Sequence, residues 1–178
     1  MLPFHCDVSW WHIHSYFDLD PNEGSIRDYL GRTDRWGCVG DLWTNTDATC
    51  DGHQGVDFVL PEGTEIVNAT TYCGIVEFAE DKGDRIGNVI LIDHSACGLP
   101  FKTEYAHLRS MMVTAGERVE PGQVIGTARG DTDTHLGLYK ARAAAGGYDL
   151  PVDPYKDVLD PNDVGYWTVE NSPQCQQP

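Results

Sequence analysis

Three histidines and one aspartate are spaced along the chain in a way that suits a metal-dependent hydrolase. His53 and Asp57 lie four residues apart, and His107 and His135 follow farther along. Catalytic zinc takes three protein ligands, often imidazoles and carboxylates, and leaves a fourth position for water. The ion lowers the pKa of this water to about 7, and a nearby base orients it. These residue types predict a zinc site, with His53 and Asp57 as two of its ligands.

Short apolar runs separated by glycine and proline must position these side chains. The runs cover residues 55–60, 65–67, 74–78, 88–93, 103–106 and 124–126. Short strands broken by turns are typical of antiparallel β structure. We therefore predict a mainly β domain, an antiparallel sheet or sandwich with a substrate groove across one face. The four candidate residues should meet on the groove floor, with walls from the N-terminal leader and residues 127–134. Residues 108–113 are expected to form a turn or two of helix.

Composition divides the chain into three segments. Residues 1–50 are an aromatic, polar and loop-rich leader that should pack on the core. Residues 51–160 form the β domain. Residues 161–178, rich in proline, asparagine and glutamine, are expected to be a loosely packed tail.

Two smaller patterns in the leader have a plain interpretation. Residues 18–24 alternate oxygen-bearing side chains as calcium loops do, but Pro21 interrupts the series, so a turn is expected. His12 and His14 are spaced to bind a metal along one strand face. Exposed histidines are common in such loops, however, so no leader metal site is predicted.

A series of motifs follows in a fixed order between residues 51 and 155. The motifs are His53-x-Gly55-x-Asp57, Gly63-Thr64, residues 87–94, Tyr105-Ala106-His107-Leu108, Val119-x-Pro121-Gly122-Gln123-x-Ile125-Gly126 and Val152-Asp153-Pro154. In this order they resemble the lysostaphin-type, LytM-domain zinc metallopeptidases, which cleave peptide cross-bridges of bacterial peptidoglycan. The resemblance implies the same β fold.

The resemblance also implies a role for each candidate residue. His53 and Asp57 match two zinc ligands. His107 matches a histidine that helps to orient water and stabilise the intermediate, and His135 matches a catalytic partner. The family's third zinc ligand is the second histidine of a His-x-His motif, and here that position is Gly137. An acidic residue usual two positions later is replaced by Tyr139.

The missing ligand leaves several substitutes open. His135 itself could turn inward, or an acid such as Asp131 or Asp133 could reach the metal. His94 matches a frequent position that is not a ligand, so we expect a structural histidine there. Any zinc bound is expected to be held more weakly than in the family.

Charge limits the partners of this chain. It has 12 Lys and Arg against 28 Asp and Glu, a formal net charge of −16. A surface this acidic repels DNA, RNA and anionic membranes, so no nucleic-acid partner is expected. No apolar run is long enough for membrane insertion.

Six scattered cysteines in a small chain indicate disulfides formed in an oxidising compartment. We therefore expect a secreted, extracellular or periplasmic protein, with buried free thiols as the alternative for the cysteines. The predicted pairs are Cys38–Cys50, Cys73–Cys97 and Cys6–Cys175, the last tying the two ends together.

Three functions are compatible with this pattern. The first is a degenerate peptidase that binds a peptidoglycan peptide or a protein partner in its groove. The second is an active zinc metalloendopeptidase with a rearranged metal site. The third is an extracellular structural or assembly protein. We predict the first, an inactive or impaired enzyme, because Gly137 supplies no side-chain donor at all.

Overall fold

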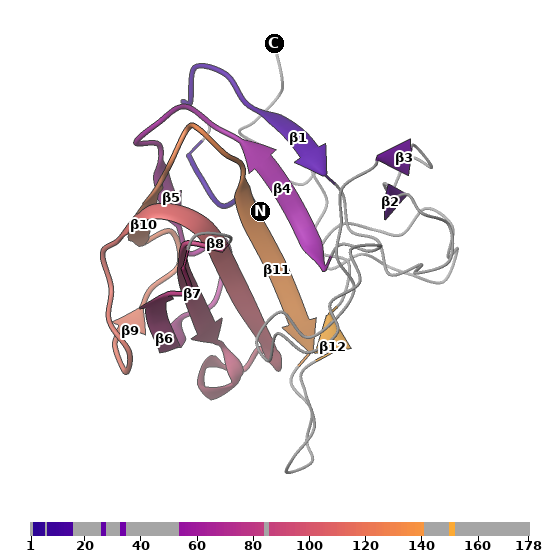
Figure 1. Cartoon of the computed structure of the whole chain (residues 1–178). Helices are drawn as coiled ribbons and strands as arrows, with labels where there is room; N and C mark the ends of the chain where they lie inside the picture. Colours follow the sequence, from indigo (N-terminus) through magenta and orange to yellow (C-terminus); the bar gives the residue numbers. More distant parts are fainter. Residues whose placement is uncertain are drawn as a thin grey trace.

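The chain folds mainly into antiparallel β-strands (Figure 1). The computed structural model describes residues 2–5, 7–15, 26–27, 33–34, 54–83, 86–140 and 150–151. Its elements are β1 (His12–Ser15), β2 (Ile26–Arg27), β3 (Thr33–Asp34), β4 (Gly55–Val59), β5 (Glu65–Val67), β6 (Gly74–Asp81), β7 (Asn88–Asp93), the short 3-10 helix η1 (Ser95–Cys97), β8 (Phe101–Met111), β9 (Arg118–Val119), β10 (Val124–Ala128), β11 (Thr134–Lys140) and β12 (Leu150–Pro151). The predicted fold class is confirmed.

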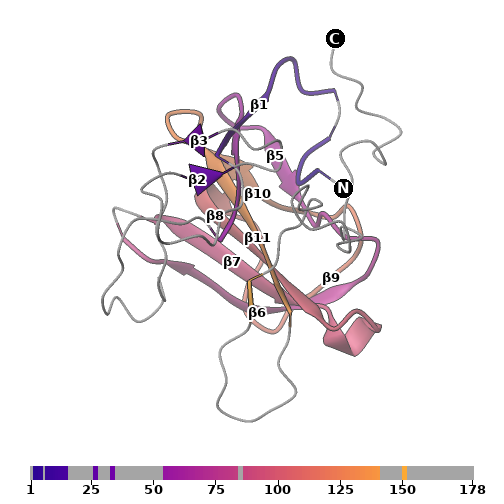
Figure 2. The same cartoon turned by 90° about the vertical axis from the view of Figure 1, so that its right-hand side faces the viewer.

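One antiparallel sheet contains most of these strands. Its order is β1-β4-β11-β8-β7-β6-β9, while β10 pairs with β5 and β8, and β12 pairs with β11. Strands β2 and β3 form a separate pair. In Figure 1, β1, β4, β11 and β8 run side by side, so β11 lies between the two strands that carry Asp57 and His107. Figure 2 shows the sheet turned, with η1 protruding at the lower right.

Successive side chains of β11 point to opposite faces of the sheet. Leu136 and Leu138 are buried, and Leu136 belongs to the main hydrophobic core. His135, Gly137 and Tyr139 lie on the opposite face, which we call the polar face. Strand β4 follows the same alternation, and so does β8 from Lys102 to Ala106, so Asp57 and Glu104 come beside the polar-face residues of β11.

The described part of the leader packs against the domain. Strand β1 pairs with β4, and the ring of Phe4 makes edge contacts with Trp11 and Phe58, at centroid distances of 5.3 and 5.6 Å. The Val67 amide donates to the Pro3 carbonyl at 2.8 Å. The predicted segment boundaries near residues 50 and 160, the tail and the calcium-like loop all lie outside the described residues.

One predicted element is wrong. Residues 108–111 continue strand β8, and no helix forms at 108–113. The reason is a partner strand: Leu108 pairs with Ala128 and Met111 with Gly126 on β10. These backbone hydrogen bonds between distant residues outweigh a local helical preference.

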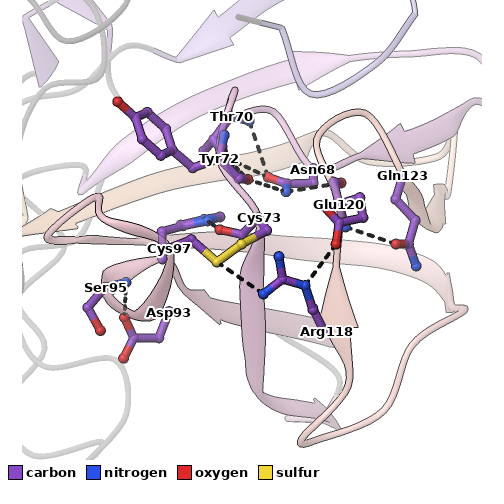
Figure 3. The surroundings of a disulfide bond; sticks show 11 residues. Asn68, Thr70, Tyr72, Cys73, Asp93, Ser95, Cys97, Arg118, Glu120 and Gln123 are labelled. Carbon is purple, nitrogen blue, oxygen red and sulfur yellow. Dashed lines mark hydrogen bonds and ion pairs between the residues drawn. A yellow bond between two sulfur atoms is a disulfide. The ribbon is translucent and has the colours of Figure 1, made fainter.

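A disulfide joins Cys73, next to the start of β6, to Cys97 at the end of η1 (Figure 3). This confirms the predicted Cys73–Cys97 pair. The other two predicted pairs involve cysteines outside the described residues.

Among the described residues, no helix has the length and apolar character needed to cross a membrane.

Candidate functional site

Strand register brings the candidate residues together on the polar face. His135 on β11 lies opposite Asp57 on β4 and Ala106 on β8. One pleat farther along, Gly137 lies opposite Gly55 and Glu104. His53 lies outside the described residues, so the predicted ligand pair is described only at Asp57.

Asp57 and His135 form a buried, hydrogen-bonded pair. The Nδ1 atom of His135 lies 2.8 Å from Oδ1 of Asp57, and both residues are less than one-tenth exposed. Burial disfavours the charged imidazole, but the Asp57 hydrogen bond and charge, with the charges of Glu104 and Asp133, outweigh it and raise the pKa of His135. The ring therefore donates to Asp57 through Nδ1.

His107 faces His135 on the polar face. The two ring centroids are 6.2 Å apart. Nδ1 of His107 lies 3.0 Å from the Ile86 carbonyl and donates to it, which leaves Nε2 as an acceptor. Burial, followed by repulsion from His135, lowers the pKa of His107 against the opposing pull of nearby carboxylates. Its backbone φ is 58°, in the left-handed region that histidine seldom adopts.

Gly55 is required by the position of the His135 ring. A Cβ atom at residue 55 would lie 2.5 Å from both Cε1 and Nε2 of that ring. The glycine of the His53-x-Gly55-x-Asp57 motif therefore provides the space in which His135 reaches Asp57.

Gly137 leaves the predicted third-ligand position without a side chain. A Cβ there would stand 2.8 Å from Cε2 of Tyr139 and 3.3 Å from Cβ of Glu104. The buried Tyr139 ring thus borders the space in which an imidazole at this position would begin. Gly137 and Tyr139, which the resemblance matches to a histidine and an acid, therefore lie next to each other on this face.

The predicted acidic substitutes lie in other contacts. Asp131 accepts hydrogen bonds from the Arg129 guanidinium at 3.1 and 3.3 Å, and its side chain is 69% exposed. Asp133 contacts Nδ1 of His14 at 2.9 Å. His14 on β1 is therefore paired with an acid next to the polar face.

Glu104 is a polar-face residue that the sequence interpretation missed. It is 3% exposed, lies on β8 directly opposite Gly137, and its charge acts on His135. The available signal was a carboxylate inside a strand run, Thr103-Glu104-Tyr105. What the sequence could not supply was the cross-strand register that places Glu104 beside Gly137.

His94 is buried in a structural role, as predicted. Its Nδ1 lies 2.9 Å from the Cys73 carbonyl and its Nε2 lies 2.8 Å from the Thr103 hydroxyl. Burial lowers the pKa of His94 despite the Cys73 hydrogen bond and the charge of Asp93. A neutral ring that donates through Nδ1 and accepts from Thr103 satisfies both nitrogens.

Known proteins share this fold. Residues 51–146 match peptidase family M23. The chain belongs to peptidase family M23. Across 87 residues it is 41% identical to the peptidoglycan DD-endopeptidase ShyC of Vibrio cholerae. The aligned region covers 47% of this chain and 19% of ShyC. Across 99 residues it is 36% identical to the Escherichia coli lipoprotein YgeR, covering 52% of the chain and 37% of YgeR.

The M23 fold is also seen in the solution structure of lysostaphin. That structure superposes with a TM-score of 0.53 at 19% identity, covering 81% of this chain and 48% of lysostaphin. The chain therefore spans less than half the length of these relatives. Its likeness to lysostaphin concerns the fold alone.

Family M23 is typically zinc-dependent, so the donors present have to suit such an ion. Asp57 supplies a buried carboxylate, and His53 is the other inherited ligand that the sequence predicts. Residue 137 supplies none, and the described residues by themselves contain no group of three His, Cys, Asp or Glu that could hold a metal ion. A three-ligand zinc site in this chain therefore needs at least one donor from outside the described residues, and His53 is the one that the sequence predicts.

Proposed function

We propose that this chain is an M23 domain with impaired catalysis, which binds a peptidoglycan peptide or a protein partner where active relatives cut. The observation that carries the proposal is the glycine at residue 137, where the resemblance predicts an imidazole ligand. The Tyr139 ring and Glu104 border the vacated place, so the inherited ligand set is one donor short. A zinc-activated water needs a firmly held ion, and two ligands hold zinc weakly.

The rest of the polar face is suited to peptide binding. His107 keeps Nε2 available as a hydrogen-bond acceptor, while His135 is held by Asp57. Backbone amides and carbonyls of a bound peptide could pair with these two rings. The substrate class follows from the family, since the related ShyC is a peptidoglycan DD-endopeptidase.

A location outside the cytoplasm is part of the proposal. The Cys73–Cys97 disulfide supports it, because disulfides persist mainly in oxidising compartments. The relative YgeR is a lipoprotein, which agrees with a place at the cell envelope.

Sedimentation with purified peptidoglycan tests the binding function. We expect the wild type to co-sediment with sacculi and to release no soluble fragments. The double variant H107A/H135A should co-sediment less, while H12A, on the exposed edge of β1, should behave as the wild type. Failure of the wild type to bind sacculi, or fragment release at the rate of an active M23 enzyme, would overturn the proposal.

An active, rearranged endopeptidase is the second candidate. One observation favours it: His107 and His135 lie together with pKa values displaced in opposite directions, the pattern of an acid and a base. The same sacculus assay decides, since fragment release that disappears in D57N would support this candidate. The structural or assembly function has no separate support in the described residues.

A further inference from the structure

The Cys73–Cys97 disulfide lies at the periphery of the domain, where an external thiol can reach it. Both cysteines are partly exposed, and no residue of η1 is buried. Tyr72, directly before Cys73, is 41% exposed. Figure 2 shows η1 protruding from the sheet. A thiol can therefore approach the two sulfur atoms while the domain stays folded.

The two sulfur atoms of this bridge have different surroundings (Figure 3). Nη1 of Arg118, on β9, lies 3.7 Å from Sγ of Cys97, and Nε of the same guanidinium donates to Oε1 of Glu120 at 2.8 Å. The guanidinium is thus held between the bridge and a carboxylate. Within the described part of the chain, no cationic side chain makes a comparable contact with Sγ of Cys73.

The contact of Arg118 with one sulfur decides which cysteine leaves in thiol–disulfide exchange. An attacking thiolate bonds to one sulfur and expels the other as a thiolate, and the more acidic thiol leaves faster. A neighbouring arginine stabilises a thiolate. Arg118 therefore favours Cys97 as the leaving group and directs the attack to Sγ of Cys73. Because Glu120 offsets part of the arginine's charge, the expected preference is moderate.

We propose that the bridge is a site of thiol–disulfide exchange in the folded protein, with Sγ of Cys73 as the attacked atom and Cys97 as the leaving thiolate. The partner is a thiol–disulfide oxidoreductase with two active-site thiols. Its first thiolate bonds to Cys73 as the Cys73–Cys97 bond breaks, and the electron pair of that bond goes to Cys97. Its second thiolate then displaces Cys73 from the mixed disulfide. The partner is thereby oxidised to a disulfide, and the chain gains two electrons and takes up two protons from water.

The reverse reaction describes how such a partner would insert the bridge. An oxidised partner forms a mixed disulfide with Cys73, and the Cys97 thiolate beside Arg118 attacks Sγ of Cys73. The Cys73–Cys97 bond closes, and the partner leaves with both thiols reduced. This inference does not rest on the proposed function, because strands β11, β8 and β7 lie between β4, which carries Asp57, and β6, which follows Cys73.

Glutathione, a monothiol, tests which sulfur is attacked. The oxidised full chain is treated with glutathione while iodoacetamide alkylates each thiolate that is released. Fragment-ion mass spectrometry then locates both groups. We expect glutathione on Cys73 and the alkyl group on Cys97. The opposite distribution, or an equal one, would overturn the inference.

The rate of reduction by dithiothreitol, followed as alkylation of Cys73 and Cys97, tests the role of Arg118. R118Q removes the charge beside Cys97, so the bridge should be reduced at least about threefold more slowly. R118K keeps the charge and should react at nearly the wild-type rate. R109Q is the matched control, because Arg109 is also paired with a glutamate and its side chain is 56% exposed, against 57% for Arg118. Equal rates in R118Q and R109Q would contradict the assignment.

G55A separates attack on the folded protein from attack after unfolding. Gly55 is on β4, three strands away from β6, and its replacement is expected to lower the stability of the domain. If the folded protein is attacked, the bridge in G55A should be reduced at the wild-type rate. Faster reduction in G55A would show that the bridge opens only after unfolding, and would overturn the inference whatever the result of the sacculus assay.

Discussion

At the scale of single residues, Gly55 controls the geometry of the His135–Asp57 pair. We expect G55A to displace the His135 ring, because the added Cβ would lie 2.5 Å from two ring atoms and from the Leu136 carbonyl oxygen. Overpacking of this kind costs about 1–3 kcal/mol. Urea unfolding measures the loss, and the histidine NMR signals report the ring. As a control, E65A changes an exposed residue of β5, which pairs with β10 and not with the strands of this pair, so it should leave those signals unchanged.

His94 should make the stability of the domain depend on pH. Its pKa is lowered in the folded state, chiefly by burial, from an ordinary value of 6.5. The unfolded chain therefore binds the proton more readily, and the stabilisation is complete above pH 6.5 and declines as the pH falls from there toward the folded-state pKa.

The measurement is the free energy of unfolding in urea across this pH interval. H94Q should be less stable near neutral pH and should show a shallower decline on acidification. H12Q, at an exposed position of β1, should keep the wild-type slope. An unchanged slope in H94Q would contradict the assignment.

At the scale of elements, the disulfide fixes β6 to the segment after β7. The cysteines are separated by 24 residues. Cross-linking a loop of this length stabilises the folded chain by about 3 kcal/mol, through the lost freedom of the unfolded state. We expect C73S/C97S to lower the free energy of unfolding by about this amount in urea, while binding to the polar face persists. A loss of peptide binding in a folded C73S/C97S protein would show that the bridge also shapes the site.

The strands show which parts of the fold a sequence can predict. Residues 88–93 were predicted as a strand and form β7, because a run of β-branched apolar residues favours one conformation. Residues 108–111 were misassigned, since their conformation depends on β10. The residues of the candidate site were likewise predicted only in part. The motifs singled out Asp57, His107 and His135, which the structure brings together, whereas Glu104 depends on pairing between distant strands.

At the scale of the whole molecule, the net charge of −16 should oppose binding to the cell wall. Peptidoglycan carries carboxylates, so long-range repulsion slows the approach of an acidic protein, and salt screens that repulsion. We expect co-sedimentation with sacculi to increase with ionic strength. A steep decrease with salt would show instead that attraction between opposite charges drives binding, and would place the contact on a basic patch.

The left-handed backbone at His107 sets the stability of the fold against the retention of histidine at this position. Asparagine and glycine adopt a φ of 58° more readily than histidine does, and the left-handed region costs ordinary residues roughly 1–2 kcal/mol. A lineage under pressure for stability alone would drift toward those two residues. A lineage that retains histidine here does so for what the imidazole contacts, which makes residue 107 an indicator of whether the polar face is still under selection.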